Sequence, residues 1–236
     1  MIEAAGPACV AIKPQLARFE ALGAPGWRAL EGSVAFARER GLLVIADGKR
    51  GDVPVSAAAY GDALFGSTET PWGPAAGLGA DAATFNPLLG ADSLEPIVER
   101  AAAAGAGVFI LVRTSNAGAA DVLDLRTEEG PLHERLALAV AALAPRLSGG
   151  GELSGAGAVV GATEPRFLAR LRELMPRAIL LLPGVGAQGG SVEELGAAFA
   201  EPASALVTAS RSVAGAEDPA AAAERLRSSV WALAGV

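Results

Sequence analysis

Two carboxylates and two cations occur within six residues, directly after a short apolar run. The run, residues 42–46, predicts a buried strand, and Asp47, Lys49 and Asp52 follow it. In an extended backbone, side chains at positions i and i+2 point to the same face, so Asp47 and Lys49 can enter one site. Asp52 would reach that site from the following loop. Taken alone, the pattern is equally compatible with a solvated turn that carries surface ion pairs.

A further charged residue, Lys13, ends the preceding apolar run. Charges at the end of a buried strand are costly to desolvate and are seldom buried unless they pair. Asp47 on the next strand is the obvious neighbour for Lys13. A lone lysine at such a place would more often lie on the surface.

Short apolar runs alternate with stretches rich in Ala, Leu, Glu and Arg, which predicts a parallel sheet covered by helices. The predicted strands are 8–13, 42–47, 82–86, 108–113, 158–161, 179–182 and 206–209. The predicted helices are 15–40 (broken near Gly23–Gly26), 56–65, 94–104, 132–147, 165–174, 192–199 and 219–233.

Polar residues gather at the carboxyl ends of the predicted strands, where an α/β barrel keeps its active site. They are Lys13, Asp47, Lys49, Asn86, Thr114, Ser115, Thr163, Gly184, Gly186, Ser210 and Arg211. We therefore predict α/β architecture in a single (β/α)8 TIM-barrel domain over residues 1–236. The seven predicted strands are one fewer than a closed barrel needs, so we expect a chain shortened at its start that lacks the first strand.

A glycine-rich loop, residues 183–190, follows the strand at 179–182. Its four glycines would let backbone N–H groups approach an anion, and a helix is predicted to follow from Ser191. The next strand ends in Ser210 and Arg211, and an arginine there can hold a phosphate with two hydrogen bonds. Together they favour a phosphorylated ligand. The alternative is a tight turn at Gly184 and Gly186, with Arg211 paired to Glu217 or Asp218.

The segment 113–116, Arg-Thr-Ser-Asn, offers hydroxyl and amide groups at another strand end. These groups suit hydrogen bonding to a flat polar base. Ordinary capping of the following turn is the alternative, and taken alone the pattern favours it.

Composition excludes several classes of protein. A net charge of −7 without a basic run argues against nucleic acid as a partner, and no apolar stretch reaches membrane-spanning length. The N-terminus carries no secretory signal. The single cysteine, Cys9, cannot form an internal disulfide, which fits a reducing cytoplasm. We expect Cys9 to be an inert thiol buried in a strand. The single histidine, His133, leaves no histidine-based metal site or triad, and we expect it on the surface.

Seven segments in this order resemble orotidine 5′-phosphate decarboxylase, in its longer bacterial-type branch. The segments are AIKPQLARFEALG, DGKRGDV, TFNPLLGADSLEP, FILVRTSNAGA, VVGATEP, LLPGVGAQGG and TASRSV. The resemblance runs from about Val10 to Val213. It implies cofactor-free, metal-free conversion of orotidine 5′-phosphate to UMP and CO2 in pyrimidine biosynthesis, by a cytoplasmic homodimer.

The resemblance also implies roles for residues. Lys13, Asp47, Lys49 and Asp52 match the catalytic charged tetrad, in which Lys49 protonates C6 of the pyrimidine. Asp47 would face the substrate carboxylate, Lys13 would hold Asp47, and Asp52 would act across the dimer interface. The expected substrate-binding residues are Ser56, Asn86, Ser115, Gly186, Gln188, Gly189, Ser210 and Arg211.

Two alternative functions follow from the same residues. Metal-dependent phosphosugar decarboxylases and synthases of the same superfamily share an Asp-x-Lys-x-x-Asp pattern, but they need an acidic residue where this chain has Lys13. A non-catalytic protein that binds nucleotide phosphates is the other alternative. It would bind UMP without turnover.

Overall fold

The computed structural model describes residues 1–186 and 188–235, and within them the chain divides into two compact units. The N-terminal unit runs from Cys9 to Val108. The C-terminal unit comprises Glu3–Ala8 and the chain from Phe109 onward. Strand β6 (Gly107–Arg113) carries the chain from one unit into the other. That the chain forms a single domain stays a prediction.

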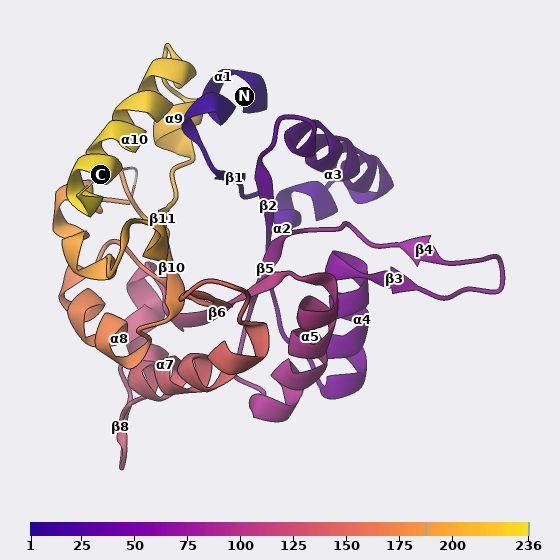
Figure 1. Ribbon diagram of the computed structural model, residues 1–236, viewed down its shortest axis with the longest axis horizontal. Helices are drawn as coiled ribbons and strands as arrows, with labels where there is room; N and C mark the ends of the chain where they lie inside the picture. Colours follow the sequence, from indigo (N-terminus) through magenta and orange to yellow (C-terminus); the bar gives the residue numbers. More distant parts are fainter. Residues whose placement is uncertain (187, 236) are drawn as a thin grey trace. The chain divides into compact units, whose positions relative to one another are not determined.

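Parallel strands form the sheet of the N-terminal unit (Figure 1). The strands β1 (Ala11–Ile12), β2 (Leu43–Arg50) and β5 (Ala82–Phe85) lie in that order. Ala11 lies opposite Leu43, and Ile45 lies opposite Ala82. All four residues of β5 are buried, as expected for a parallel strand covered on both faces.

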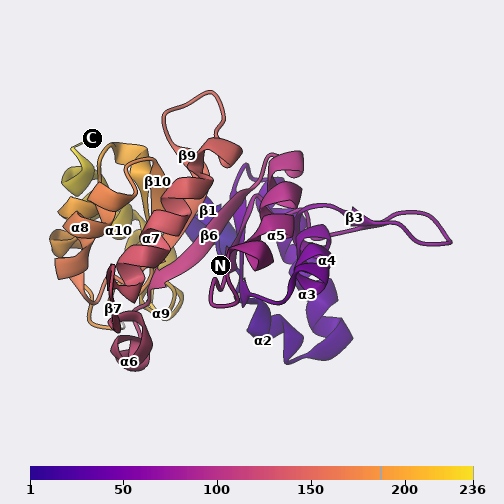
Figure 2. The ribbon, with the colours of Figure 1, turned by 90° about the horizontal axis from the view of Figure 1, so that it is seen from below.

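Helices α2 (Leu16–Glu20), α3 (Gly23–Arg38), α4 (Pro54–Phe65) and α5 (Ala91–Ala104) belong to the same unit. The buried residues of α5 recur at helical spacing: Leu94, Ile97, Val98 and Ala101. Helices α4 and α5 lie side by side (Figures 1 and 2). Gly61 of α4 permits this approach, because a Cβ there would lie 3.0 Å from Cβ of Arg100.

The C-terminal unit repeats the parallel arrangement with β6, β9 (Ser154–Val160), β10 (Ala178–Leu182) and β11 (Ala205–Val207), in that order. Its helices are α6 (Ala120–Leu123), α7 (Leu132–Leu143), α8 (Leu168–Leu174), α9 (Arg211–Ala214) and α10 (Pro219–Ala234). A 3₁₀ turn, Gly6–Ala8, packs against α10, and α1 (Ile2–Ala5) precedes that turn.

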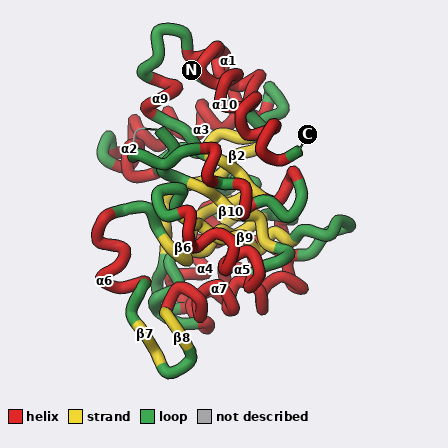
Figure 3. The backbone as a smooth tube through the Cα atoms, turned by 90° about the vertical axis from the view of Figure 1, so that its left-hand side faces the viewer, coloured by secondary structure: helices red, strands yellow, loops and turns green. Residues whose placement is uncertain are grey.

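Two short antiparallel hairpins were not expected from the sequence. Strands β3 (Ser67–Thr68) and β4 (Ala75–Ala76) form the first, which projects from the N-terminal unit beyond α4 (Figure 2). Strands β7 (Arg126–Thr127) and β8 (Gly130–Pro131) form the second, drawn in yellow beyond α6 in Figure 3. Neither hairpin carries the alternating apolar pattern that would predict a strand.

All seven predicted parallel strands are present, but three predictions need correction. Only Ala11–Ile12 of the first predicted strand pairs as a strand, and Ala8 lies in a 3₁₀ turn. The first helix breaks before Gly23 rather than after it, because Pro25 fits the first turn of α3 without losing a hydrogen bond. The predicted helix 192–199 consists instead of two 3₁₀ turns, Val192–Glu194 and Gly196–Ala198.

Candidate active site

A buried carboxylate bound by two ammonium groups lies in the N-terminal unit. Asp47 is 7% exposed. Nζ of Lys13 donates to its Oδ2 and Nζ of Lys49 donates to its Oδ1, each at 2.5 Å. The structure therefore confirms that Asp47 binds both lysines. Because its carboxylate is buried, the interpretation as a solvated turn is ruled out. These two residues are also the only lysines in the sequence, in which 17 of the 19 Lys and Arg residues are arginine.

The sheet positions this cluster through its parallel pairing. Lys13 follows β1, and the backbone N–H of Asp47 donates to the carbonyl of Pro14 at 3.0 Å. The register between β2 and β5 then shifts between Ala46 and Arg50. Within this irregularity Lys49 has φ = 49°, the only positive φ of a non-glycine among the described residues. A left-handed backbone costs a lysine roughly 1–2 kcal/mol, so contacts of this cluster must hold it.

Thr84 on β5 completes the cluster and was missed by the sequence analysis. Its hydroxyl donates to Oδ1 of Asp47 at 3.0 Å, and the residue is 1% exposed. The available signal was a hydroxyl within a fully buried apolar strand, two residues before the strand-end Asn86. Such a hydroxyl needs a partner, and the neighbouring strand ends in Asp47.

The two cations set the charge state of Asp47. Burial disfavours the charged carboxylate, but the positive charges and hydrogen bonds of Lys13 and then Lys49 outweigh it and lower the pKa of Asp47 below its ordinary value of 3.8. Asp47 is therefore an acceptor-only carboxylate at neutral pH.

Because the folded-state pKa of Asp47 is lowered, its ionisation stabilises the fold above the ordinary value and loses this effect as pH falls through the folded-state pKa. We expect Asp47→Asn to lower the free energy of unfolding by about 2–4 kcal/mol near pH 7, because the change leaves the Lys13 ammonium without its counter-charge. The difference from wild type should shrink below about pH 4. Urea unfolding between pH 3 and 7 measures it, with the exposed Asp121→Asn as control. A difference that stays constant with pH would contradict this account.

Three other predicted residues of the N-terminal unit lie outside this hydrogen-bonded cluster. The carboxylate of Asp52 accepts the backbone N–H of Val53 at 2.7 Å. Oδ1 of Asn86 accepts the backbone N–H of Leu88 at 3.0 Å. Ser56 lies half-buried in the first turn of α4. Their proposed roles toward a substrate stay predictions.

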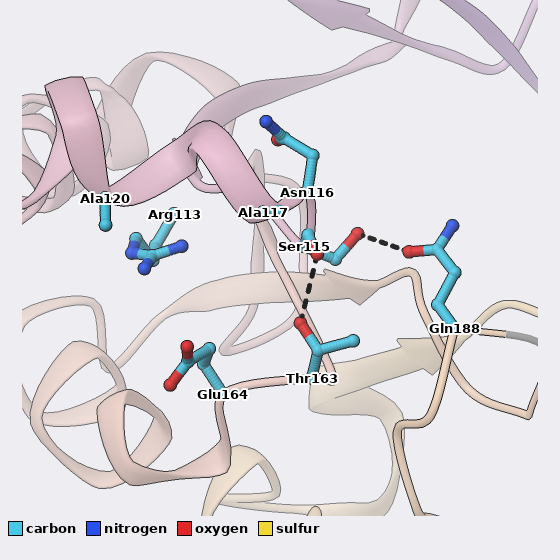
Figure 4. Close-up of a pocket in the computed structure, with 8 residues that line it drawn as sticks. All are labelled: Arg113, Ser115, Asn116, Ala117, Ala120, Thr163, Glu164 and Gln188. Carbon is cyan, nitrogen blue, oxygen red and sulfur yellow. Dashed lines mark hydrogen bonds between the residues drawn. The ribbon is translucent and has the colours of Figure 1, made fainter.

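An open pocket of about 520 Å³ lies in the C-terminal unit, lined by Arg113, Ser115, Asn116, Ala117, Ala120, Thr163, Glu164 and Gln188 (Figure 4). Oγ of Ser115 donates to Oε1 of Gln188 at 2.9 Å, although the two residues are 73 positions apart in the chain. Oγ1 of Thr163 donates to the carbonyl of Ser115 at 3.2 Å. The structure therefore brings together Ser115 and Gln188, two of the residues predicted to bind the substrate.

The remaining polar residues of segment 113–116 form hydrogen bonds with other residues of the protein. Nε and Nη2 of Arg113 donate to the two carboxylate oxygens of Asp124, at 2.7 and 3.1 Å. Oγ1 of Thr114 donates to Oδ1 of Asn116 at 2.7 Å. The side chain of Asn116, which precedes the 3₁₀ turn Ala117–Ala119, makes no capping hydrogen bond to that turn, so the capping alternative is not borne out. Of this segment, only Ser115 contacts another residue that is predicted to bind the substrate.

The glycine-rich loop uses its backbone N–H groups internally. Gly186 donates to Gly190, Gly189 to Gly186 and Gly190 to Gly184, at 2.8–3.0 Å. Ala187 lies outside the described residues. The internal bonds and the positive φ of Gly184, Gly186 and Gly189 favour the tight-turn interpretation over an amide cradle for an anion. The predicted helix from Ser191 is the 3₁₀ turn described above.

The side chains near this loop remain suited to an anion. A Cβ on Gly186 would lie 3.2 Å from Cβ of Ser212, so the loop that carries Gln188 lies against the start of α9. Arg211 is the first residue of α9, directly after Ser210, and it is exposed. No described contact pairs Arg211 with Glu217 or Asp218, and Asp218 instead caps α10 by accepting the N–H of Ala221.

Two predictions about single residues are wrong. His133 is buried, with Nδ1 2.8 Å from the carbonyl of Leu123 and its ring edge-on to Phe167, because it faces inward from the first turn of α7. Cys9 is exposed and precedes β1 rather than lying in a strand. Partial desolvation still raises the pKa of its thiol.

The described residues contain no group of three or more His, Cys, Asp and Glu side chains placed to hold a metal ion. No helix in this part of the chain combines the length and apolar character needed to cross a membrane.

Comparison with known proteins identifies the family. Residues 1–226 match the model of the Orotidine 5'-phosphate decarboxylase / HUMPS family. The chain is 45% identical to the orotidine 5'-phosphate decarboxylase of Deinococcus radiodurans, over 90% of this chain and 74% of that one. It is 44% identical to that of Rhodopirellula baltica, over 90% and 70%.

A solved structure gives the same result for the fold. The OMP decarboxylase of Leishmania donovani superposes with a TM-score of 0.81 at 35% identity, over 100% of this chain and 85% of that one. The predicted α/β architecture of TIM-barrel type is confirmed. The chain belongs to the orotidine 5'-phosphate decarboxylase family.

Proposed function

We propose that this chain decarboxylates orotidine 5′-phosphate to UMP and CO2 without a metal or organic cofactor. The observation that carries the proposal is the pair of lysines on the buried carboxylate of Asp47. Cleavage of the bond between C6 and the carboxylate releases CO2 and leaves an electron pair on C6. That position has no electron sink, so a neighbouring cation must stabilise the charge and supply a proton.

Lys49 is the better placed of the two cations to supply that proton. Its side chain is 47% exposed, against 19% for Lys13. We infer that Lys49 reaches the substrate and transfers its proton to C6, after which solvent reprotonates the amine. Lys13 is the inner cation that holds Asp47. Asp47, kept ionised by both lysines, would face the departing carboxylate.

The C-terminal unit carries most of the other residues that are proposed to bind the substrate. Ser115 is proposed to hydrogen-bond the pyrimidine, with Gln188 and Arg211 on the phosphate. Gly186 and Gly189 shape the loop that carries Gln188. Ser210, Asn86 and Ser56 complete the proposed set. Phosphate contacts far from C6 supply binding energy that can be used at the reacting carbon.

We expect Arg211→Ala to raise the KM for orotidine 5′-phosphate by about 10- to 100-fold, the effect of losing one charge-assisted contact to phosphate. Steady-state kinetics measures the change. Arg225→Ala on α10, which removes another exposed arginine, is the matched control and should leave KM unchanged. An equal KM in both variants would remove Arg211 from the phosphate site.

A homodimer in the cytoplasm is also proposed, with Asp52 contributed to the partner's site. Asp52 is followed by Val53 and Val55, which are 54% and 85% exposed at the start of α4. Apolar side chains so exposed beside a predicted catalytic residue suit burial in an interface. Sedimentation equilibrium tests this proposal, and a monomer at micromolar concentration would contradict it. The single free cysteine fits a reducing compartment.

The decisive experiment follows the ultraviolet absorbance of orotidine 5′-phosphate with EDTA present, using Lys49→Ala as the control. Turnover in EDTA that is lost in Lys49→Ala supports the proposal. Turnover in EDTA would also eliminate the metal-dependent phosphosugar enzymes, which the Lys13–Asp47 pair already disfavours. Binding of UMP without turnover would indicate the non-catalytic alternative.

A further inference from the structure

Thr84 lies where the pairing between β2 and β5 is irregular. It lies opposite the irregularity in β2, because Ala46 pairs with Ala83 and Arg50 pairs with Phe85. Between these pairs β2 has three residues, 47–49, whereas β5 has only Thr84. A bulge of this kind re-aims side chains and is found beside active sites. The residue opposite it is therefore able to set where the bulge directs Asp47 and Lys49.

The hydroxyl of Thr84 is bound on both sides. It accepts the backbone N–H of Lys49 at 2.9 Å and donates to Oδ1 of Asp47 at 3.0 Å. The same Oδ1 accepts Nζ of Lys49 at 2.5 Å. These contacts form a closed ring that joins the backbone of Lys49, the hydroxyl, the carboxylate and the ammonium of Lys49.

We propose that Thr84 is a positioning residue for proton transfer by Lys49, an inference that rests on the proposed decarboxylase function. Its hydroxyl holds Lys49 in the left-handed backbone and fixes the rotation of the Asp47 carboxylate. The backbone conformation of Lys49 and the carboxylate of Asp47 then both fix the direction of the Lys49 ammonium. Without the hydroxyl, the Lys49 N–H lacks this acceptor and Oδ1 of Asp47 loses a donor in a buried site, so the ammonium is less well aimed.

Two comparisons isolate the hydroxyl. Thr84→Val keeps the shape of the wild-type threonine without its oxygen, and Thr84→Ser and Thr84→Ala differ from one another only in the oxygen. We expect Thr84→Val and Thr84→Ala to lower kcat by about 10- to 100-fold, with KM changed less than about threefold. Thr84→Ser should retain kcat within about threefold of wild type. Thr127→Val is the control, because the Thr127 hydroxyl also donates once and accepts once, in the β7–β8 turn.

A second measurement does not depend on turnover. Because Lys13 and Lys49 are the only lysines, protein labelled with [15N]lysine shows only two lysine amide signals. The Lys49 amide should exchange with solvent at least about tenfold faster in Thr84→Val and Thr84→Ala than in wild type and Thr84→Ser. If Thr84→Val does not fold, the Ser and Ala variants decide the question.

The outcomes separate this inference from the proposed function. A wild-type chain that does not turn over orotidine 5′-phosphate defeats the function, whatever the exchange rates. An active wild type with an unchanged kcat in Thr84→Val overturns the positioning role alone. Equal exchange of the Lys49 amide in all variants, or a loss of kcat in Thr84→Ser as large as that in Thr84→Ala, would also overturn it.

Discussion

Lys49→Ala is expected to lower kcat for orotidine 5′-phosphate by at least about 10³-fold, through loss of the proton donor and of the cation beside C6. The fold should survive, because Asp47 keeps its bonds to Lys13 and Thr84. Steady-state turnover and thermal unfolding measure the two effects separately. A kcat within tenfold of wild type would exclude Lys49 as the donor.

Two further substitutions separate charge, proton and backbone at this position. Lys49→Arg keeps a positive charge near Asp47, but a guanidinium does not give up a proton at neutral pH, so turnover should stay low. Lys49→Gly should be as inactive as Lys49→Ala yet more stable by about 1 kcal/mol, because glycine adopts φ = 49° without strain. Equal stability of the Gly and Ala variants would contradict the strain.

The use of only two lysines in the chain agrees with this chemistry. Arginine serves at the other 17 basic positions, including the buried Arg113 and Arg172. Arginine forms stronger bidentate contacts, but it holds its proton too tightly for acid–base work. Lysine is kept at the two positions that contact Asp47, where the proposed mechanism requires one ammonium to release a proton.

The parallel strands could be predicted because each is a short apolar run that ends in a polar group. The same pattern placed Lys13 and Asp47 on neighbouring strands, so their contact followed from topology alone. The contact of Lys49 with Asp47 was predicted from extended geometry, yet it forms through a left-handed residue in a bulge. The argument from the alternation of side chains in a strand therefore predicted the correct pair, but it did not include the bulge that brings the pair together.

Other features depended on tertiary contacts that a local sequence pattern indicates weakly or not at all. Thr84 resembles any β-branched strand residue until the bulge opposite it is known. His133 was expected at the surface because it lies at the start of a helix. Its ring instead packs edge-on against Phe167, and Nδ1 contacts the carbonyl of Leu123. The segment 192–199 has helical composition, yet it forms two 3₁₀ turns on either side of Leu195.

Arg172→Met is expected to give the largest loss of stability. The guanidinium of Arg172, in a residue only 8% exposed, donates five hydrogen bonds of 2.7–2.9 Å to four backbone carbonyls, those of Met175, Ala178, Ala198 and Ser204. Burial lowers the pKa of Arg172 from its ordinary range. Methionine fills similar space but donates nothing, so these buried acceptors lose partners and the free energy of unfolding should fall by about 3–5 kcal/mol.

Urea unfolding of Arg172→Met beside Arg170→Met tests this expectation within one helix. Arg170 lies two residues earlier on α8, with a side chain 53% exposed and paired to Glu134 on the surface, so its loss should change stability little. Arg172→Lys should fall between them, because one ammonium has three donors and no planar fork to reach four carbonyls. Equal losses of unfolding free energy in Arg172→Met and Arg170→Met would show that the four carbonyls find other donors. Arg172 would then not be needed to connect the end of α8, the start of β10 and the turns at Ala198 and Ser204.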